Sequence, residues 1–511
     1  MRNNFKPLGI AAAVAAAAAG YANVASAQTT ATPAVANNAL GDLAIVPYYT
    51  VQEGWVTGVH VINTSSETQV VKFRLRRASD SLDALDFNII MSPEDVWAGF
   101  ISQDESGDIS FSSNDTTCTA PAAVNGAFVM PDIYREGAET GYVEVIAMGA
   151  SDGSGPIDDA AVHVDDIPVN CEAVRSNFFA SGTSATAPGV FDYNTSYQAS
   201  YKRGDTTVEG GENAYEPAGD VLKVSYFIRD NDSGVEFGDN AVHISGFLAE
   251  ASITNQERGY LSGDLQGFDF PDLNGGVPNS AADDRGQFAL LRSPGVLGVG
   301  ELINEWSANP SNGVAVDWVV TMPGQYTMLD MPNYIAALDD EDLECNPGTA
   351  GTAYDEDTGA NCDFRDIPVT ATVVPYNREE FTPDGPSGEL VVSPSLPGAP
   401  DDTVLEKEVN VISFGGNSVL GDTDVDITAD LRQPYGWVNL SVTSRDSGDQ
   451  AVCEWQEATA PETIADLSTV CSVVLGNVPM IGFAAWQRSV AANPDASYGR
   501  IIAHSFRSAA N

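Results

Sequence analysis

Apolar and polar residues alternate along much of this chain, in short runs separated by turn-forming segments. Residues 43–51, 56–62 and 70–75 are rich in β-branched and aromatic residues, and the turn formers 52–54 and 63–66 lie between them. A period of two residues is typical of β-strands with one buried face. Further runs of this kind predict strands at residues 87–90, 96–101, 142–147, 221–228, 241–247, 314–321, 369–374, 409–414, 436–442, 470–475, 481–486 and 498–504.

Helical patterns are few. Residues 171–179 and 300–307 are the two segments whose composition favours a helix. Many short strands with turns between them, and few helices, predict a mainly β fold made of antiparallel β-sandwich units with few short helices.

The chain is longer than one sandwich needs, so we expect two or more sheet units. Residues 382–402 are rich in Pro, Gly and Ser and predict a linker, and a softer break lies near residues 204–219. The predicted organisation is therefore an N-terminal β-sandwich domain (28–203), a middle β-rich region with a short helix (204–381), the linker (382–402) and a C-terminal β-rich region (403–511).

The first 27 residues have the pattern of a secretory signal peptide. Arg2 and Lys6 precede an apolar run at residues 8–20, and Ala25 and Ala27 form a small-x-small cleavage site. No later run reaches the ~20 apolar residues that a membrane-spanning helix requires. We expect a protein without a membrane span that is secreted, attached to the cell surface or held in the periplasm after cleavage near Ala27.

Six cysteines follow the signal, and none has the CxxC spacing of a metal site. In an oxidising compartment an even number of cysteines favours disulfides, although six allow 15 pairings. Proximity in the sequence suggests the pairs Cys118–Cys171, Cys345–Cys362 and Cys453–Cys471.

Charge excludes one class of partner. The 511 residues contain 72 acidic and 23 basic side chains, giving a formal net charge of −49. Nucleic acids are excluded as partners, because each phosphate contact needs a Lys or Arg. Lysine occurs at five positions in the whole chain. This acidic, lysine-poor composition suits a saline exterior, where salt screens the repulsion among carboxylates.

One short segment departs from the acidic background. Lys72, Arg74 and Arg76 alternate with apolar residues in the predicted strand 70–75, and Arg77 follows. The alternation places the apolar side chains on the core face and the three cations on the other face. We consider two interpretations: a docking strip for an acidic protein surface, an anionic polysaccharide or a second copy of the chain, or a solvated face paired internally with carboxylates.

Acidic loops suggest calcium as a ligand. Residues 355–363 provide Asp355, Asp357, Asn361 and Asp363 around a glycine, and these oxygen donors are the type that Ca²⁺ prefers. Residues 229–234 have a related composition. Both loops can equally be solvated turns.

Catalytic signatures are lacking in the sequence, which contains no HExxH, GxSxG or phosphate-binding glycine motif. The four histidines (His60, His163, His243 and His504) are far apart, and a sheet-face imidazole is the simpler interpretation of two of them. The sequence favours a non-enzymatic function, although a glycosidase with two carboxylates stays open. The seven tryptophans mostly lie in predicted strands, where we expect them to anchor the core.

Four segments (47–101, 316–323, 479–486 and 497–504) resemble blocks that recur in an uncharacterised family of exported, β-rich bacterial proteins. The resemblance implies an exported β protein and implies no activity, cofactor or site residue. Our leading hypothesis is a structural or adhesive extracellular protein that acts through protein or surface contacts. The alternative is a secreted carbohydrate-binding protein or a carboxylate-dependent glycoside hydrolase.

Overall fold

The computed structural model describes most of the chain after the signal segment. The described residues are 32–176, 215–253, 271–273, 290–324, 369–377, 403–427, 434–445, 453–456, 468–474 and 478–507, apart from 80, 82, 136, 152, 154, 155, 250, 252, 422, 472, 491, 494 and 495.

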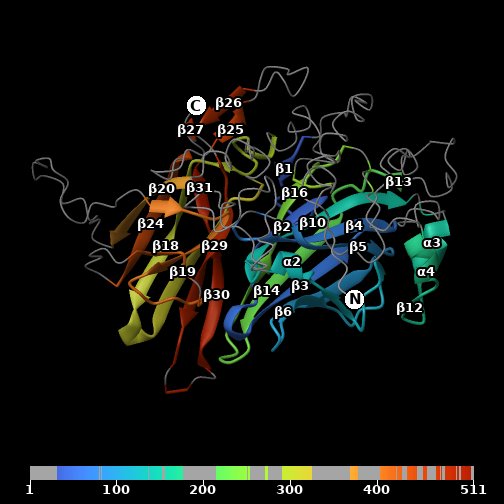
Figure 1. Ribbon diagram of the computed structural model, residues 1–511, viewed down its shortest axis with the longest axis horizontal. Helices are drawn as coiled ribbons and strands as arrows, with labels where there is room; N and C mark the ends of the chain where they lie inside the picture. The colour runs from blue at the N-terminus through green and yellow to red at the C-terminus, as the bar shows by residue number, and fades with distance from the viewer. Residues whose placement is uncertain are drawn as a thin grey trace, which may run out of the picture.

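The mainly β fold is confirmed, and nearly all strand pairs are antiparallel. Two sandwich units lie side by side, one drawn from blue to green and the other from yellow to red (Figure 1). Short helical segments accompany them: η1 (Gln52–Gly54), α2 (Asp132–Arg135), α3 (Pro156–Ala161), α4 (Cys171–Ser176) and η4 (Pro310–Asn312).

The first unit consists of two sheets. Sheet I has the order β1 (Ala34–Val35), β16 (Val242–Ser245), β2 (Leu43–Thr50), β10 (Thr140–Ser151), β4 (Gln69–Arg77), β5 (Asp83–Met91) and β8 (Cys118–Ala120), with β13 (Tyr215–Glu216) on β10. Sheet II has the order β15 (Glu236–Asn240), β14 (Leu222–Asp230), β3 (Trp55–Asn63), β6 (Val96–Gln103), β7 (Ile109–Ser112) and β9 (Ala127–Val129). A small hairpin is formed by β11 (His163–Val164) and β12 (Ile167–Pro168).

Aromatic rings fill the space between these sheets. Phe73 and Phe87 of sheet I pack against Trp97 and Phe111 of sheet II, with ring centroids between 4.9 and 5.8 Å apart. All four side chains are almost completely buried. The alternating sequence pattern therefore produces the expected sandwich core.

The second unit is an eleven-stranded sheet that folds over at the β18–β19 hairpin into two layers. Sheet III contains β21 (Thr403–Leu405), β20 (Val369–Asn377), β24 (Tyr435–Arg445) and β18 (Glu301–Asn309), with β27 (Val473–Val474) on β24 and β31 (Ser505–Arg507) on β18. Sheet IV contains β23 (Val425–Ile427), β22 (Val409–Phe414), β19 (Val314–Thr321), β29 (Ile481–Arg488) and β30 (Tyr498–Ala503). Two further pairs are β17 (Gly298–Val299) with β28 (Val478–Pro479), and β25 (Cys453–Gln456) with β26 (Ser468–Cys471).

The core of the second unit is built around tryptophan. Trp306 of sheet III and Trp318 of sheet IV both contact Phe414, with ring centroids 6.1 and 6.0 Å apart. Their indole N–H groups donate to the backbone oxygens of Tyr376 and Glu305, at 3.0 and 2.8 Å. These buried rings confirm the expected role of tryptophan at both positions.

The two units share a core. The N–H of Val409 donates to the oxygen of Ala78 at 3.0 Å, and the rings of Tyr226 and Phe483 lie 6.3 Å apart. One apolar cluster contains residues of both units. The first unit therefore covers the outer face of sheet IV.

Strand pairing corrects the predicted domain organisation. β14 pairs with β3 and β16 pairs with β2, so residues 215–245 complete the first sandwich. Residues 298–377 share the second unit with residues 403–507. The predicted middle region (204–381) is thus divided between the two units, because its strands find their partners far away in the sequence. The predicted linker (382–402) lies outside the described residues.

One of the two expected helices is a strand. Residues 300–307 lie mainly in β18, where Leu302 and Trp306 are buried and the intervening Glu301, Ile303 and Glu305 are not. This period of two fits the pairing with β24, which overrides the local helix preference. The other expected helix is confirmed in part as α4.

Candidate functional site

The basic strip on β4 is buried. Val71, Phe73 and Leu75 face the core as predicted. The three cations on the opposite face are also buried, with exposed fractions of 2% for Lys72, 0% for Arg74 and 3% for Arg76, and Arg77 at the end of the strand is 2% exposed. An exposed docking strip, and equally a solvated face, are therefore wrong predictions, because the second face of sheet I is covered as well.

Internal pairing with carboxylates, the other part of our interpretation, is confirmed. Lys72 Nζ lies 2.7 Å from Asp86 Oδ2, and Arg74 Nε lies 3.0 Å from Asp83 Oδ2. Glu144 on β10 accepts from Arg74 Nη1 at 3.2 Å and from Arg76 Nε at 3.0 Å. β4 lies between β5 and β10, so carboxylates flank its cations from both sides. We call Lys72, Arg74, Arg76, Asp83, Asp86 and Glu144 the ionic layer, and its contacts indicate a structural role.

The predicted bond between Cys118 and Cys171 is present and joins β8 to α4. Cys453 and Cys471 are directly opposite each other in the β25–β26 pair, a placement that suits the predicted second bond. Cys345 and Cys362 lie outside the described residues, so their bond stays a prediction.

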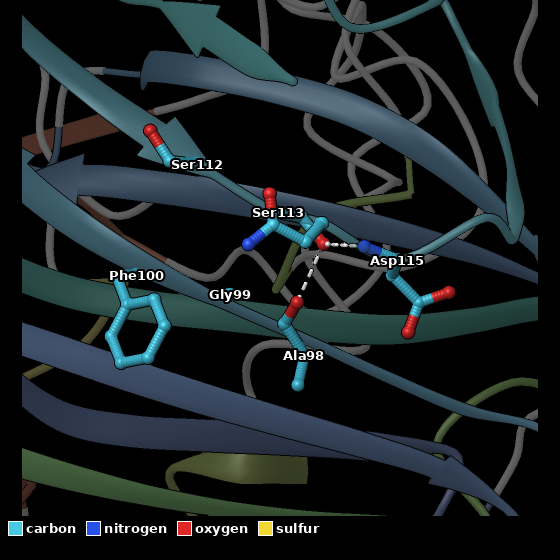
Figure 2. A pocket seen from close by; sticks show the side chains of 7 residues that line it. Ala98, Gly99, Phe100, Ser112, Ser113 and Asp115 are labelled. Carbon is cyan, nitrogen blue, oxygen red and sulfur yellow. Dashed lines mark hydrogen bonds between the residues drawn. The ribbon is translucent and has the colours of Figure 1, made fainter.

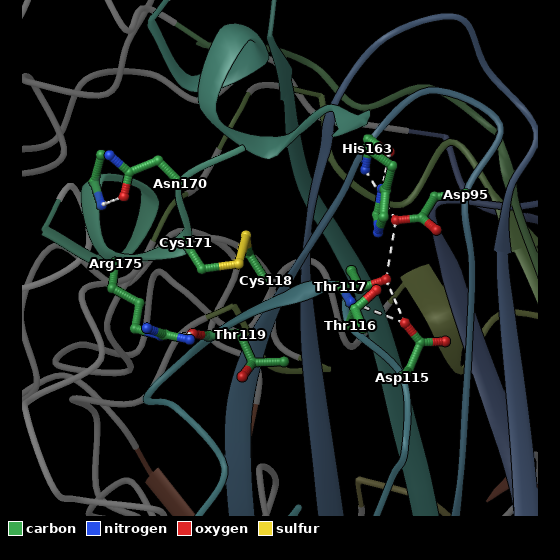
Figure 3. The surroundings of a disulfide bond; sticks show 12 residues. Asp95, Asp115, Thr116, Thr117, Cys118, Thr119, His163, Asn170, Cys171 and Arg175 are labelled. Carbon is green, nitrogen blue, oxygen red and sulfur yellow. Dashed lines mark hydrogen bonds between the residues drawn. A yellow bond between two sulfur atoms is a disulfide. The ribbon is translucent and has the colours of Figure 1, made fainter. Parts of the chain in front are cut away.

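A polar cluster lies close to this disulfide (Figure 3). His163 Nδ1 is 3.0 Å from Ser92 Oγ, and Asp95 Oδ2 accepts from Thr117 Oγ1 at 3.1 Å and from the Ser92 N–H at 3.2 Å. Burial raises the pKa of Asp95, and the nearby His163 opposes that shift. The sequence did not predict this cluster, because Ser92 and His163 are 71 residues apart in the chain.

The cluster does not have the geometry of a nucleophilic triad. In such a triad a carboxylate orients the histidine, and the serine oxygen is accessible to substrate. Within the described part of the chain, Asp95 makes no hydrogen bond to His163, and Ser92 is only 4% exposed. The contacts instead attach the β11–β12 hairpin to the turn between β5 and β6.

The acidic loop predicted to bind calcium (Asp355, Asp357, Asn361 and Asp363) lies outside the described residues. In the related loop at residues 229–234, a carboxylate bonds to the backbone of the same loop. Asp230 accepts from the N–H groups of Asp232 and Ser233 at 2.9 and 3.2 Å. Among the residues that the structure describes, no group of His, Cys, Asp or Glu could hold a metal ion.

A hollow of about 350 Å³ lies on sheet II beside Phe100 (Figure 2). Ser113 Oγ in its wall donates to the oxygen of Ala98 at 2.6 Å and accepts from the N–H of Asp115 at 3.0 Å. The carboxylate of Asp115 accepts from Thr117 Oγ1 at 2.7 Å. The polar groups of Ser113 and Asp115 bond to each other, to Thr117 or to nearby backbone. They therefore do not point together into the hollow, where a ligand would bind.

The outer face of sheet III has a different character. Trp437 on β24 is directly opposite Tyr376 on β20, and their rings stack with centroids 4.1 Å apart and planes 6° from parallel. Trp437 is 39% exposed, and Tyr435, two residues earlier on the same strand, is 42% exposed. Two exposed rings and the half-buried ring of Tyr376 thus share one surface of sheet III.

The row of side chains continues to β18 and from there to β29 and β30 of sheet IV, where Trp486 is half-buried against the core of the second unit. Glu305 on β18 is the partner of Trp437 on the other side, and its Oε1 accepts from Arg500 Nη2 on β30 at 3.0 Å. The guanidinium of Arg500 lies 4.6 Å above the ring of Trp486, whose centroid is 5.7 Å from that of Tyr498. We call these six side chains the aromatic band: Tyr376, Trp437, Glu305, Arg500, Trp486 and Tyr498.

The band is accessible at its polar positions too. The exposed fractions are 53% for Arg500 and 44% for Glu305, and Tyr498 is 48% exposed. An exposed ion pair between rings offers hydrogen-bond donors and acceptors next to apolar surfaces. The band can therefore bind a ligand that has both hydroxyl groups and apolar faces.

Sequence reasoning missed this site, although a signal was present. Trp437 shares its strand parity with Asn439 and Ser441, whereas Val438, Leu440 and Val442 have the opposite parity and are buried. A tryptophan at a polar-facing position predicts exposure. The expectation that tryptophans anchor the core holds for Trp97, Trp306 and Trp318 and is wrong for Trp437.

Comparisons with protein-family models, curated proteins and solved structures found no match to this chain. Of the helices in the described ranges, none is long and apolar enough to cross a membrane. A functional argument therefore depends on the site alone.

Proposed function

We propose that this protein is an exported adhesive protein that attaches to a surface or partner through the aromatic band. The single observation that carries this proposal is the exposed Glu305–Arg500 pair, which lies between the stacked rings of Tyr376 and Trp437 on sheet III and the rings of Trp486 and Tyr498 on β29 and β30. Exposed aromatic residues gathered on one face favour a binding surface, because scattered exposed rings are the ordinary case.

Features of the chain support an exterior location. Residues 1–27 have the pattern of a signal peptide, and Cys118 and Cys171 are joined as expected of an oxidising compartment. We expect the mature protein to be secreted or held at the cell surface.

The arrangement of the two units favours binding over catalysis. The ionic layer is buried inside the first unit, where a substrate has no access. The cluster of Ser92, Asp95 and His163 bonds within itself and lacks an accessible nucleophile. The band is exposed to solvent at Trp437, Tyr498, Glu305 and Arg500, and paired strands of the second unit carry these side chains, which suits a rigid attachment surface.

Attachment of protein-coated beads tests the proposal. Beads carrying mature protein, coupled through its N-terminus, are added to washed cells of the producing organism, and retained beads are counted after flow. We expect Trp437→Ala to reduce retention about tenfold or more, since an interface depends on a few aromatic anchors. Phe100→Ala is the matched control, because Phe100 is an exposed ring (48%) on sheet II. Equal retention of the Trp437→Ala beads and wild-type beads would contradict the proposal.

A further inference from the structure

The aromatic band combines two kinds of surface in a fixed order. Proceeding across the strands, it presents two stacked rings, an acid, a guanidinium and two further rings. Neighbouring strands are about 4.8 Å apart, so Tyr376, Trp437 and Glu305 follow one another over about 10 Å. The band is therefore elongated and runs across the strand direction.

This order suits a sugar chain better than a protein surface. A pyranose ring has an apolar C–H face that packs on an aromatic ring, and hydroxyl groups at its edge that bond to carboxylate and guanidinium groups. The centre of a protein interface is also rich in aromatic residues and Arg, but it is depleted of acidic residues such as Glu and excludes water. Here an ion pair that is 53% and 44% exposed lies between the rings.

Charge selects among polysaccharides. Glu305 and Arg500 form a pair with no net charge, and the whole chain carries a formal charge of −49. A polyanion would be repelled by the molecule as a whole, whereas a neutral chain would not. The anionic polysaccharide considered for the basic strip has no exposed cationic strip to bind, because those cations are buried.

We propose that the aromatic band binds a neutral polysaccharide, with sugar rings packed against Trp437 and Tyr498 and hydroxyl groups bonded to Glu305 and Arg500. This inference rests on the proposed function and names the ligand class of the same surface. The polymer lies across β20, β24, β18 and β30, the strands that supply these side chains.

Affinity electrophoresis tests the ligand class. The mature protein is run through native gels that contain hydroxyethyl cellulose, arabinoxylan, glucomannan or laminarin, and through gels with alginate or no polymer. We expect at least one neutral polymer to retard the wild-type protein, with about tenfold weaker apparent affinity for Trp437→Ala. Tyr498→Ala should weaken binding in the same gel, and alginate should not retard the protein. Phe100→Ala, on the other sandwich unit, should migrate as wild type.

A variant that keeps the shape of the site guards against loss of folding. Glu305→Gln preserves side-chain size while removing the charge that Arg500 bonds, and we expect a several-fold loss of retardation. Thermal unfolding is measured for every variant, and those that melt as wild type are compared.

The outcomes separate this inference from the proposed function. If no neutral polymer retards the protein while Trp437→Ala still abolishes bead attachment, the carbohydrate inference fails and adhesion through the band stands with a protein partner. If neutral polymers retard wild type and Trp437→Ala alike, the inference fails because binding lies elsewhere. If bead attachment is unchanged in Trp437→Ala but retardation is lost, the ligand class is supported and the adhesive role is not.

Discussion

Arg74 Nε lies 3.0 Å from Asp83 Oδ2, and both side chains are completely buried. A buried ion pair of this kind contributes little net stability, because removing two ions from water offsets their attraction. Losing one partner is different, since it leaves the other charge buried without its counter-ion. The ionic layer therefore makes the first unit sensitive to single substitutions rather than unusually stable.

Arg74→Ala should lower the free energy of unfolding by about 3–5 kcal/mol, because Asp83 and Glu144 then lose a cation inside the protein. Urea unfolding followed by tryptophan fluorescence measures the change. Arg507→Ala is the control, since its pair with Glu301 is 67% and 36% exposed and such pairs contribute about 0–1 kcal/mol. Similar losses for the two variants would show that the ionic layer behaves as a surface network.

Two buried acids each contribute a pH-dependent part of the stability, and this part grows at mildly acidic pH. Burial raises the pKa of Asp42 and Asp317 to about 6, from an ordinary value of 3.8. Between these values the native carboxyl binds more protons than the unfolded one, so the contribution of each acid to the free energy of unfolding rises as the pH falls from 7 to 4. The gain is up to about 3 kcal/mol for each acid. Asp42→Asn should remove its share of this pH dependence in urea unfolding at pH 7, 5.5 and 4.

Two histidines have the opposite effect. Burial lowers the pKa of His243 and His504 to about 4, from an ordinary value of 6.5. As the pH falls from 6.5 to 4, these histidines bind protons in the unfolded state but not in the native state. The free energy of unfolding therefore decreases, by up to about 3 kcal/mol for each histidine. His243→Gln should therefore become more stable relative to wild type on acidification. His60→Gln, with an exposed ring, is the control; parallel curves for His243→Gln and wild type would refute the assignment.

Disulfide mapping checks the cysteine assignment. Mass spectrometry of unreduced peptides should identify the pairs Cys118–Cys171 and Cys453–Cys471, and the remaining pair should be Cys345–Cys362. Cys118 and Cys171 are 53 residues apart in the sequence. Substitution of both by serine should lower the free energy of unfolding by about 4 kcal/mol in the chain-entropy model. A peptide that joins cysteines of different predicted pairs would contradict the scheme.

Salt should raise the melting temperature. The net charge of −49 repels itself in the folded state, and the Debye length falls from about 30 Å to about 3 Å between 0.01 and 1 M salt. Thermal unfolding in NaCl over this range measures the effect, and repeating the series at pH 4, where more carboxylates are protonated, should give a smaller rise. A melting temperature that falls with salt at pH 7 would be inconsistent with a saline exterior.

The strand at residues 70–75 and Trp437 show which features the alternation of apolar and polar residues predicted. The alternation at residues 70–75 correctly placed Phe73 in the core and Arg74 on the other face. It could not show that this other face is covered, since strand periodicity separates two faces without saying what packs on either. In the same way, the parity of Trp437 was readable, but its stacking on Tyr376 and its position beside Glu305 depend on strand register.

The sequence by itself determined the acidic charge and predicted the mainly β class, because both follow from composition and local patterns. It also suggested the cysteine pair 118–171 and a signal peptide. Only the tertiary structure decided where the strands after residue 214 belong, that the basic strip is buried, and that an aromatic band exists. The band joins Glu305 to Arg500, which are 195 residues apart, and such a contact is fixed by pairing and packing across the whole second unit.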